Sequence, residues 1–353
     1  MKLMIITPSL KGGGLERVVS SLSNYLASQL NIQVSLLCLS SMPSFYTIDA
    51  AVKLIQCPTN ISKLSKFFRI HPLGLWLRKK VKAENPSSII SFGEGYNSFV
   101  IISTLGLCIP IYVCNRASPY SSLSGVRGLI NPKVYPFANG VILQTNSAKK
   151  ILSKKYHKST FHVIGNPVAR VIANHKKKLF ILNVGRVGGK KNQDWLITYF
   201  HKLKSKDNWK LYLVGSGPNE QKCQDLIAKK KLEDKVFMLG QQKEVHQFYE
   251  EAAIFAFTSI SEGFPNALAE AMAYGCACIC FDCIAGPSDL IDNGINGFLI
   301  PLDDHHLYQE KLQLLVDDPE LRTKLGMAAK EKIKQFEVGK IARKYLEIAF
   351  QTS

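Results

Sequence analysis

The sequence Leu-Phe-Ile-Leu-Asn-Val-Gly-Arg-Val-Gly-Gly-Lys-Lys-Asn occupies residues 179–192 and joins an apolar run to a glycine-rich, basic loop. A helical pattern follows at once over Gln193–Lys204. A short apolar run, a loop and an amphipathic helix form the repeating unit of a parallel sheet whose two faces are covered by helices. We therefore expect residue 179 to begin the first strand of such a sheet.

The same alternation extends in both directions. On the amino-terminal side we expect a first helix from Leu15 to about Leu30, and strands over Lys2–Thr7, Gln33–Leu39, Ser88–Phe92, Ile109–Cys114, Gly140–Gln144 and Thr160–Ile164. On the carboxyl-terminal side we expect strands over Trp209–Val214, Lys235–Leu239, Ile254–Thr258 and Ala277–Phe281, with helices over Pro218–Lys230, Val245–Glu250 and Pro265–Tyr274. From Asp303 the pattern is helical, with breaks near Pro319 and Phe336.

The alternation weakens at Gly165-Asn166-Pro167 and again at 174–178, where the chain is polar and charged. Such a segment before a fresh strand favours a domain boundary. The sequence predicts an α/β protein with two doubly wound, Rossmann-like domains, one over 1–170 plus about 337–353 and the other over 171–336. Open parallel sheets bind ligands at the carboxyl ends of their strands, so we expect the domains to face a shared cleft.

The charge of the chain is unevenly distributed. The net charge is +18, and residues 1–175 hold 20 Lys and Arg against 4 Asp and Glu, whereas residues 176–353 hold 25 against 23. The excess in the first half predicts an anionic partner such as a membrane surface, nucleic acid or polyphosphate. Because no apolar run is long enough to span a bilayer and the start resembles a strand and turn, we expect a cytoplasmic protein.

Four of the nine cysteines, Cys276, Cys278, Cys280 and Cys283, are closely spaced. Two interpretations are open, a metal cluster and a set of buried free thiols. Zinc sites usually combine two knuckles separated by a longer loop, whereas the first three of these cysteines alternate and would share one face of a strand. The spacing favours free thiols in a core, and we expect no metal site.

Two carboxylates, Glu262 and Glu270, bracket a turn and the start of a helix. Pro265 suits a first helical position, and Gly263 before it permits a sharp entry. One interpretation is a capped helix with a nearby acid. The other is a ligand loop, in which the carboxylates bind sugar hydroxyls and the amides at the helix start face phosphate.

Glycine turns follow two further strands, at Gly12-Gly13-Gly14 and at Val214–Pro218. Neither turn has the spacing of the dinucleotide-binding fingerprint. This argues against a nicotinamide-dependent dehydrogenase. In the loop at 185–192, Arg186 and Lys191 offer the two usual cations for holding phosphate, although a solvated basic loop is the alternative.

Taken in order, these segments resemble glycosyltransferase family 4, whose members are retaining enzymes with the GT-B fold. The resemblance rests on Gly12–Glu16, Gly185-Arg186 with Lys191-Asn192, Val214–Pro218, the spacing of Glu262 and Glu270, Gly286-Pro287, and Asn296–Pro301. It covers nearly the whole chain and is strongest from 179 to 301. It is closest to members that build bacterial surface polysaccharides, such as lipopolysaccharide and capsule, or lipid-linked oligosaccharides.

The resemblance implies a role for each matching position on the donor side. Arg186 and Lys191 would neutralise the donor diphosphate, Glu262 would contact the donor sugar, and Glu270 would bind the ribose. Donor contacts would also come from the backbone of Phe264, Pro265, Asn266 and Leu268, and from a loop carrying Gly13 and Gly14. The nucleotide would be UDP, and since the sequence contains no Asp-x-Asp motif, we expect no metal and no other cofactor.

On the acceptor side the resemblance points to Asn97 and Arg116, at the ends of two strands of the first domain. The sequence departs from the family here, because Ala117 and Ser118 replace the more usual polar pair and no histidine lies nearby. The first domain would receive a glycan, carried on a polyprenyl diphosphate, and the second would bind the nucleotide sugar. The expected activity is that of a hexosyltransferase moving a hexose or N-acetylhexosamine.

The basic segment Ser62–Lys82 mixes Lys and Arg with Phe67, Phe68 and Trp76. An ordinary surface helix would explain it locally, but with the charge of the whole domain it favours contact with an anionic membrane. We expect a peripheral protein on the inner face of the cytoplasmic membrane. The alternatives are a nucleotide-sugar epimerase or hydrolase of the same fold, and a nucleic-acid-binding protein, for which no binding module is recognisable.

Overall fold

A computed structural model describes residues 1–171, 176–204 and 207–350, except for the side chains of residues 66 and 67. The chain divides into two compact units. The first comprises Met1–Pro167 and Val338–Ser353, and the second comprises Val168–Glu337. The amide of Val168 donates to the carbonyl of Phe336 over 2.8 Å, so the two ends of the second unit lie side by side.

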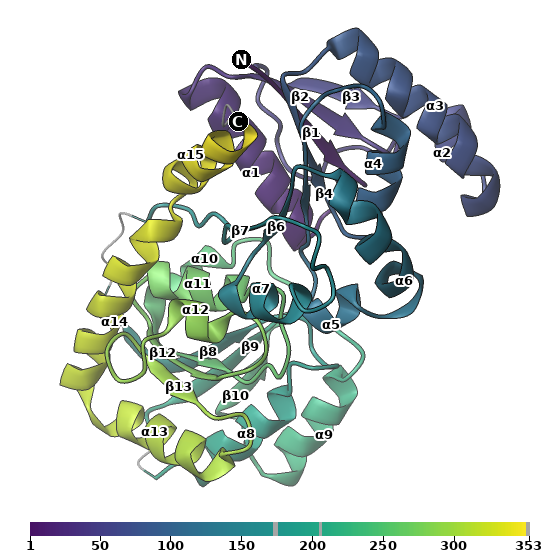
Figure 1. Cartoon of the computed structure of the whole chain (residues 1–353). Helices are drawn as coiled ribbons and strands as arrows, with labels where there is room; N and C mark the ends of the chain where they lie inside the picture. Colours follow the sequence, from purple (N-terminus) through teal and green to yellow (C-terminus); the bar gives the residue numbers. More distant parts are fainter. Residues whose placement is uncertain (172–175, 205–206, 351–353) are drawn as a thin grey trace. The chain divides into compact units, whose positions relative to one another are not determined.

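The first unit is built on a seven-stranded parallel sheet in the order β3-β2-β1-β4-β5-β6-β7. Its strands are β1 (Lys2–Thr7), β2 (Gln33–Cys38), β3 (Lys53–Gln56), β4 (Ser88–Phe92), β5 (Ile111–Cys114), β6 (Gly140–Leu143) and β7 (Phe161–Val163). Its helices are α1 (Gly14–Gln29), α2 (Thr59–Ser62), α3 (Lys66–Glu84), α4 (Asn97–Thr104), α5 (Pro119–Ser122), α6 (Gly125–Val134), η1 (Tyr135–Phe137), α7 (Asn146–Leu152) and α15 (Val338–Ala349). Helix α15 packs against α1 and β4, while α3, α4 and α6 pack in succession (Figure 1).

The second unit has a six-stranded parallel sheet in the order β10-β9-β8-β11-β12-β13. Its strands are β8 (Lys178–Val184), β9 (Lys210–Val214), β10 (Val236–Met238), β11 (Ala252–Phe257), β12 (Ala277–Phe281) and β13 (Phe298–Ile300). Its helices are α8 (Gln193–Lys202), α9 (Glu220–Lys229), α10 (His246–Glu251), α11 (Asn266–Ala273), α12 (Pro287–Leu290), α13 (His305–Asp317), α14 (Pro319–Ile333) and η2 (Lys334–Phe336). The expected α/β class with two doubly wound sheets is confirmed.

The sequence pattern missed the edge strands β3 and β13. Strand β3 is exposed over most of its length, so it lacks the apolar run that marks a buried strand. Strand β13 has three residues between Gly297 and Pro301, which is too short for a periodic signal. Part of the polar segment predicted at 174–178 lies outside the described residues.

The strands of the second unit bury both faces. Along β8, Phe180 and Leu182 pack in one core cluster and Ile181 in another, so successive residues contribute to opposite sides of the sheet. This explains why the strand reads as a continuous apolar run. The cluster of Ile181, the first core cluster, contains leucine and phenylalanine from α8 and tyrosine and leucine from α13. The cluster of Phe180 and Leu182, the second core cluster, contains residues of α11 and α14.

The closely spaced cysteines belong to this core. Cys276, Cys278 and Cys280 lie in one cluster, as their alternation predicted. Burial raises the pKa of all three thiols, and it raises the pKa of Cys283 to about 12. Metals bind the thiolate form of cysteine, so these environments oppose metal binding. Within the described residues, no group of three or more His, Cys, Asp or Glu side chains is placed to hold a metal ion.

None of the helices in the described ranges combines the length and the apolarity that a bilayer-spanning segment needs. In the segment predicted to meet a membrane, Leu73, Leu77 and Val81 of α3 are buried in the core. Trp76 is half-buried against the same core. The side chains of residues 66 and 67 lie outside the described ones. Phe68 and Leu75 are exposed.

Glu84, at the end of α3, is the basis of a prediction about acid stability. Its carboxylate pairs with the ammonium groups of Lys53 at 2.6 Å and Lys2 at 3.1 Å. The pKa of the Glu84 carboxyl is lowered from 4.5 to about 2. The hydrogen bond from Lys53 is the largest cause, and Lys2 adds to it. A lowered folded-state pKa adds stability above pH 4.5, and this contribution disappears as the pH falls from 4.5 towards 2.

We therefore expect Glu84→Gln to lower the free energy of unfolding at pH 7 by about 1–2 kcal/mol, because the exposure of Lys53 weakens the pair. Urea unfolding from pH 7 to pH 2.5 measures the difference between wild type and variant. That difference should shrink below pH 4.5. A difference that stays constant down to pH 2.5 would show that the carboxylate charge is not its source.

Candidate active site

Two neighbouring strands of the second unit, β8 and β11, carry the loops that the sequence singled out. The strand order reverses between them, and ligands of open α/β sheets bind at this switch point. The loop 185–192 follows β8, and residues 258–265 follow β11. The amide of Ile260 donates to the carbonyl of Lys190 at 2.9 Å, and the Thr258 hydroxyl donates to that of Lys191 at 2.7 Å. The two segments are therefore joined directly.

Lys191 and Glu262 form an ion pair across this junction. Lys191 Nζ donates to Glu262 Oε1 over 2.5 Å. The side chains are 28% and 12% exposed, and Lys191 Nζ also lies 5.4 Å from the centre of the Phe257 ring. The structure thus brings together two predicted site residues that are 71 positions apart. The exposed part of Lys191 leaves its charge accessible to a second anion.

Arg186 provides another cation in the same loop. It is exposed, and no ion pair holds its guanidinium within the described part of the chain. Its carbonyl accepts a hydrogen bond from the Gln193 side chain over 3.2 Å, and Gln193 Oε1 accepts one from the amide of Gly188 over 3.1 Å. The buried glutamine therefore fixes the loop backbone, while the arginine side chain stays available.

The glycines of Val214–Pro218 have a packing role. A Cβ on Gly215 would lie 2.0 Å from the carbonyl oxygen of Gly185, and a Cβ on Gly217 would lie 2.1 Å from that of Val187. Gly215 also has a φ of +133°, which favours glycine. These two glycines let the turn after β9 pack directly on the loop that carries Arg186.

The helix expected at Pro265 begins one residue later. Pro265 is the N-cap of α11, with φ −81° and ψ 73°, and no side chain caps the helix. The prediction that Pro265 is the first helical residue is therefore wrong by one position, because its ψ is not helical. The capped-helix interpretation receives no support, since the capping hydrogen bond is missing from this described terminus.

The other predicted donor residues divide into core and surface positions. Phe264 and Leu268 are buried in the second core cluster, and the Phe264 ring lies 5.7 Å from that of Phe336. The side chains of these two residues therefore belong to the core, and the donor contacts expected from their backbone remain a prediction. Asn266 and Glu270 are half-buried. Glu270 is the fifth residue of α11, about one turn into the helix.

In the first unit, Gly13 is the N-cap of α1 and Gly14 is its first residue. The Tyr46 hydroxyl donates to the carbonyl of Gly13 over 3.1 Å. A Cβ on Gly13 would lie 2.4 Å from Glu16 Oε2, so the glycine makes room for that carboxylate. The role of Gly13 and Gly14 in closing over a donor remains a prediction.

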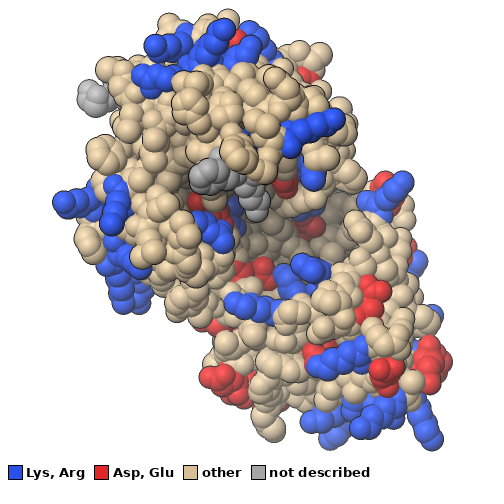
Figure 2. Space-filling model, turned by 90° about the vertical axis from the view of Figure 1, so that its right-hand side faces the viewer, with Lys and Arg blue, Asp and Glu red and all other residues tan. Residues whose placement is uncertain are grey.

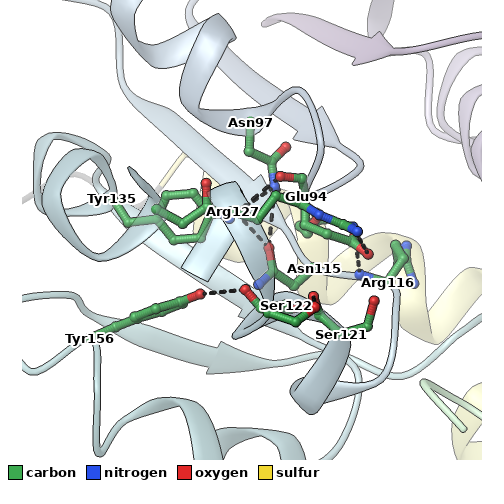
Figure 3. A network of polar contacts seen from close by, with 12 residues as sticks. Glu94, Asn97, Asn115, Arg116, Ser121, Ser122, Arg127, Tyr135 and Tyr156 are labelled. Carbon is green, nitrogen blue, oxygen red and sulfur yellow. Dashed lines mark hydrogen bonds and ion pairs between the residues drawn. The ribbon is translucent and has the colours of Figure 1, made fainter. Parts of the chain in front are cut away.

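Asn97, predicted on the acceptor side, is fully buried. Its Oδ1 accepts from the Ser91 hydroxyl over 2.9 Å, and its Nδ2 donates to the Cys114 carbonyl over 3.0 Å, among other contacts (Figure 3). Nδ2 also approaches Asn115 Oδ1 at 3.3 Å and the Tyr135 hydroxyl at 3.2 Å. The side chain joins the ends of β4 and β5 and leaves no polar atom for a ligand.

Arg116, the second predicted acceptor residue, lies over the Phe92 ring at 4.8 Å. Its guanidinium donates to Asn166 Oδ1, and to the hydroxyl of Tyr345 on α15 over 2.9 Å. Burial raises the pKa of Tyr345, so this hydroxyl is neutral. The arginine thereby fixes α15, the last helix of the first unit, to the end of β5.

Sequence reasoning missed two charged residues beside this network, Glu94 and Arg127. Glu94 follows β4 between two glycines, and its Oε2 accepts a hydrogen bond from the Arg116 amide over 3.1 Å (Figure 3). Arg127 Nη1 lies 3.9 Å from Glu94 Oε1. The available signal was a lone acid at a strand end, flanked by glycines, within a strongly basic segment.

The chain is similar in sequence to known glycosyltransferases. Residues 167–332 match the family of glycosyl transferases group 1. The chain is 26% identical over 338 residues to the amylovoran biosynthesis glycosyltransferase AmsD of Erwinia amylovora, covering 93% of each chain. It is 27% identical over 365 residues to N-acetylgalactosamine-N,N'-diacetylbacillosaminyl-diphospho-undecaprenol 4-alpha-N-acetylgalactosaminyltransferase of Campylobacter jejuni, covering 98% of each.

The fold itself is shared with solved structures. The complex of the Anabaena protein HepE with UDP and glucose superposes with a TM-score of 0.78 at 17% identity, covering 98% of each chain. At this identity the likeness establishes the fold. The chain therefore has the GT-B fold, and its residues 167–332, nearly half of it, match the family of glycosyl transferases group 1.

Proposed function

We propose that this chain is a retaining hexosyltransferase of glycosyltransferase family 4. It moves a hexose or N-acetylhexosamine from a nucleoside-diphosphate sugar, with UDP as the nucleotide, to a growing glycan. The observation that carries the proposal is the Lys191–Glu262 pair at the switch point of the second sheet, with Arg186 exposed in the same loop. The site combines cations for a diphosphate with a carboxylate for sugar hydroxyls.

The chemistry follows from where charge develops. As the acceptor oxygen bonds to the anomeric carbon, the bond from that carbon to the phosphate oxygen breaks and its electron pair leaves with the nucleoside diphosphate. Cations directed at this phosphate stabilise the transition state more than the ground state. In this proposal Arg186 and Lys191 supply the charge, and no metal takes part.

Retention of configuration is proposed to proceed by attack on the face from which the diphosphate leaves. The acceptor hydroxyl then delivers its proton to the departing phosphate oxygen, so that no separate protein base is needed. Glu262 holds a hydroxyl of the transferred sugar, and Glu270 binds the ribose. Within Phe264 to Leu268, the amides of Phe264, Ala267 and Leu268 face the sugar and the phosphates at the uncapped start of α11, since Pro265 has no N–H and the Asn266 amide donates to the Phe264 carbonyl over 2.9 Å.

The acceptor is proposed to be a glycan on a polyprenyl diphosphate, used in bacterial surface polysaccharide biosynthesis, including lipopolysaccharide and capsule. The names of the two relatives support this proposal. One acts in amylovoran biosynthesis, and the other carries a diphospho-undecaprenol acceptor in its name. The solved complex of HepE contains UDP, which supports the nucleotide.

A sugar-nucleotide panel tests the donor proposal. Thermal shift with each nucleotide sugar, followed by turnover with lipid-linked glycans, should identify at least one donor that both stabilises the protein and is consumed. Product analysis with and without acceptor separates transfer from epimerisation or hydrolysis, which need no acceptor. No shift and no turnover with any donor would contradict the proposal, and salt-sensitive DNA binding alone would favour the nucleic-acid alternative.

We further propose that the first unit contacts an anionic membrane on the cytoplasmic side, where a lipid-linked acceptor is held. Helix α6 supports this, because Val126, Leu129 and Ile130 share one face and are 69%, 70% and 42% exposed. Lys133, also exposed, continues that face. Exposed apolar residues beside basic ones suit an interfacial helix. Figure 2 shows Lys and Arg side chains in separate groups with uncharged surface between them.

Vesicle co-sedimentation tests the membrane proposal. At low salt we expect stronger binding to anionic than to neutral vesicles, since each basic residue near the surface adds about 1 kcal/mol. Leu129→Gln should weaken the binding, whereas Met327→Gln, at an exposed position of the second unit, serves as the control. Equal binding to both vesicle types would remove the electrostatic part of the proposal.

A further inference from the structure

Carboxylates are rare in the amino-terminal half, where residues 1–175 contain four. Three of them have evident local partners. Glu16 accepts from a serine hydroxyl at 3.0 Å, Asp49 accepts from a backbone amide in its own loop at 2.8 Å, and Glu84 is held by two lysines. The fourth, Glu94, is 7% exposed and lies at the end of a central strand. A buried acid at that place calls for a separate explanation.

The two carboxyl oxygens of Glu94 have different surroundings. Oε2 accepts the hydrogen bond from the Arg116 amide at 3.1 Å. Oε1 lies 3.9 Å from Arg127 Nη1, which is beyond hydrogen-bond reach. No other hydrogen bond reaches Oε1 from the residues that the structure describes. One oxygen therefore joins two loops, while the other keeps its acceptor capacity beside a guanidinium that balances its charge.

The position of Glu94 in the fold is that of a ligand site. It follows β4, and the strand order of the first sheet reverses between β1 and β4. This is the switch point at which open α/β sheets bind ligands. The next residue, Gly95, is exposed, and a Cβ built on it would have no atom within 4 Å. Space is therefore open at Gly95, the residue next to Glu94 in the chain.

The polar side chains around Glu94 are hydrogen-bonded to the protein, so the Glu94 carboxylate is the group that can accept a hydrogen bond from a ligand. Asn131 of α6 donates to the Glu94 carbonyl at 3.4 Å, and the polar atoms of Asn97 are taken up between β4 and β5. Asn115 is 3% exposed, and its Nδ2 is a buried donor with no partner among the described residues. Such a donor beside the network is expected to be satisfied by a ligand or water.

We propose that Glu94 binds a hydroxyl of the acceptor sugar through Oε1, and that Arg127 holds the carboxylate charge in place. The proposal rests on the proposed glycosyl transfer and names its acceptor-binding residue. A carboxylate is a strong acceptor for a sugar hydroxyl, and hydrogen bonds to charged groups exceed neutral ones. Asn97 and Arg116 are positioning residues in this arrangement, because they fix the loops on either side of Glu94.

The test is the kinetics of Glu94→Gln with a donor and an acceptor that the wild type uses. The glutamine oxygen can still accept from the Arg116 amide, so the loops stay joined while the charge is lost. We expect the acceptor KM to rise at least about tenfold, roughly 1.4 kcal/mol, with the donor KM within about twofold. Glu94→Asp, which keeps the charge, should be affected less.

Asp49→Asn is the matched control, because it removes the same charge from a carboxylate that also accepts a backbone amide. It should leave the acceptor KM unchanged. Gly95→Ala tests the open space without touching the network, and it should raise the acceptor KM while the melting temperature stays constant. If the wild type transfers sugar and the acceptor KM is unaltered in both Glu94→Gln and Gly95→Ala, this inference is overturned but the proposed function is not. Absence of transfer by wild type would instead overturn the proposed function.

Discussion

Replacing Lys191 by alanine is expected to lower the rate of sugar transfer at least about a hundredfold, roughly 2.7 kcal/mol. In the proposed mechanism this variant loses a cation that stabilises the departing diphosphate. Arg186→Ala should lower the rate more than about tenfold for the same reason. Single-turnover measurements with saturating donor separate this loss from weaker binding.

Lys191→Ala should also destabilise the second unit, because it leaves the Glu262 carboxylate, 12% exposed, without its cation. Adding Glu262→Gln should restore much of the melting temperature and none of the transfer rate. Lys190→Ala is the control, since this neighbour is exposed and only its carbonyl is bonded within the described segment. A loss of less than about tenfold in both Lys191→Ala and Arg186→Ala would contradict the assigned role.

Gly286→Ala is expected to lower the free energy of unfolding of the second unit by about 2–4 kcal/mol. Gly286 has a φ of +133°, and a Cβ there would lie 2.3 Å from Pro265 Cδ. The added methyl group must displace the proline that precedes α11, so the affinity for a nucleotide sugar should fall as well. Urea unfolding and donor titration measure the two effects.

Gly294→Ala separates backbone strain from this clash. Gly294 also has a positive φ, +76°, but a Cβ there would meet no atom within 4 Å. We expect a loss of about 1–2 kcal/mol from the left-handed backbone alone, with donor affinity preserved. If both variants lose equal stability and bind the donor normally, the contact with Pro265 is unimportant.

Much of the fold could be predicted because buried parallel strands are apolar on both faces. Strand β12 was predicted at its observed limits, Ala277–Phe281, and β1 at Lys2–Thr7. The short edge strands could not be found in this way, since β3 is largely exposed. The sequence pattern also predicts the exact first residue of a helix poorly when a proline lies just before the helix, as Pro265 does before α11.

The site could be predicted where the chemistry of a side chain and its position after a strand indicate the same role. Lys191 and Glu262 meet because their loops follow neighbouring strands, β8 and β11, and a doubly wound order implies this adjacency. Asn97 and Arg116 were singled out as polar residues at strand ends, yet no pattern reveals that their polar atoms are occupied by other parts of the chain. Glu94 is the converse case, a buried acid whose availability depends on its three-dimensional surroundings.

Helix α15 has a practical consequence for dividing the protein. It follows the last residue of the second unit and completes the first, where Tyr345 receives the Arg116 guanidinium. A polypeptide ending at residue 332, where the family match ends, would lose that hydroxyl and uncover β4. The second unit is thus one continuous stretch, 168–337, whereas the first unit is assembled from two separated pieces of sequence, 1–167 and 338–353.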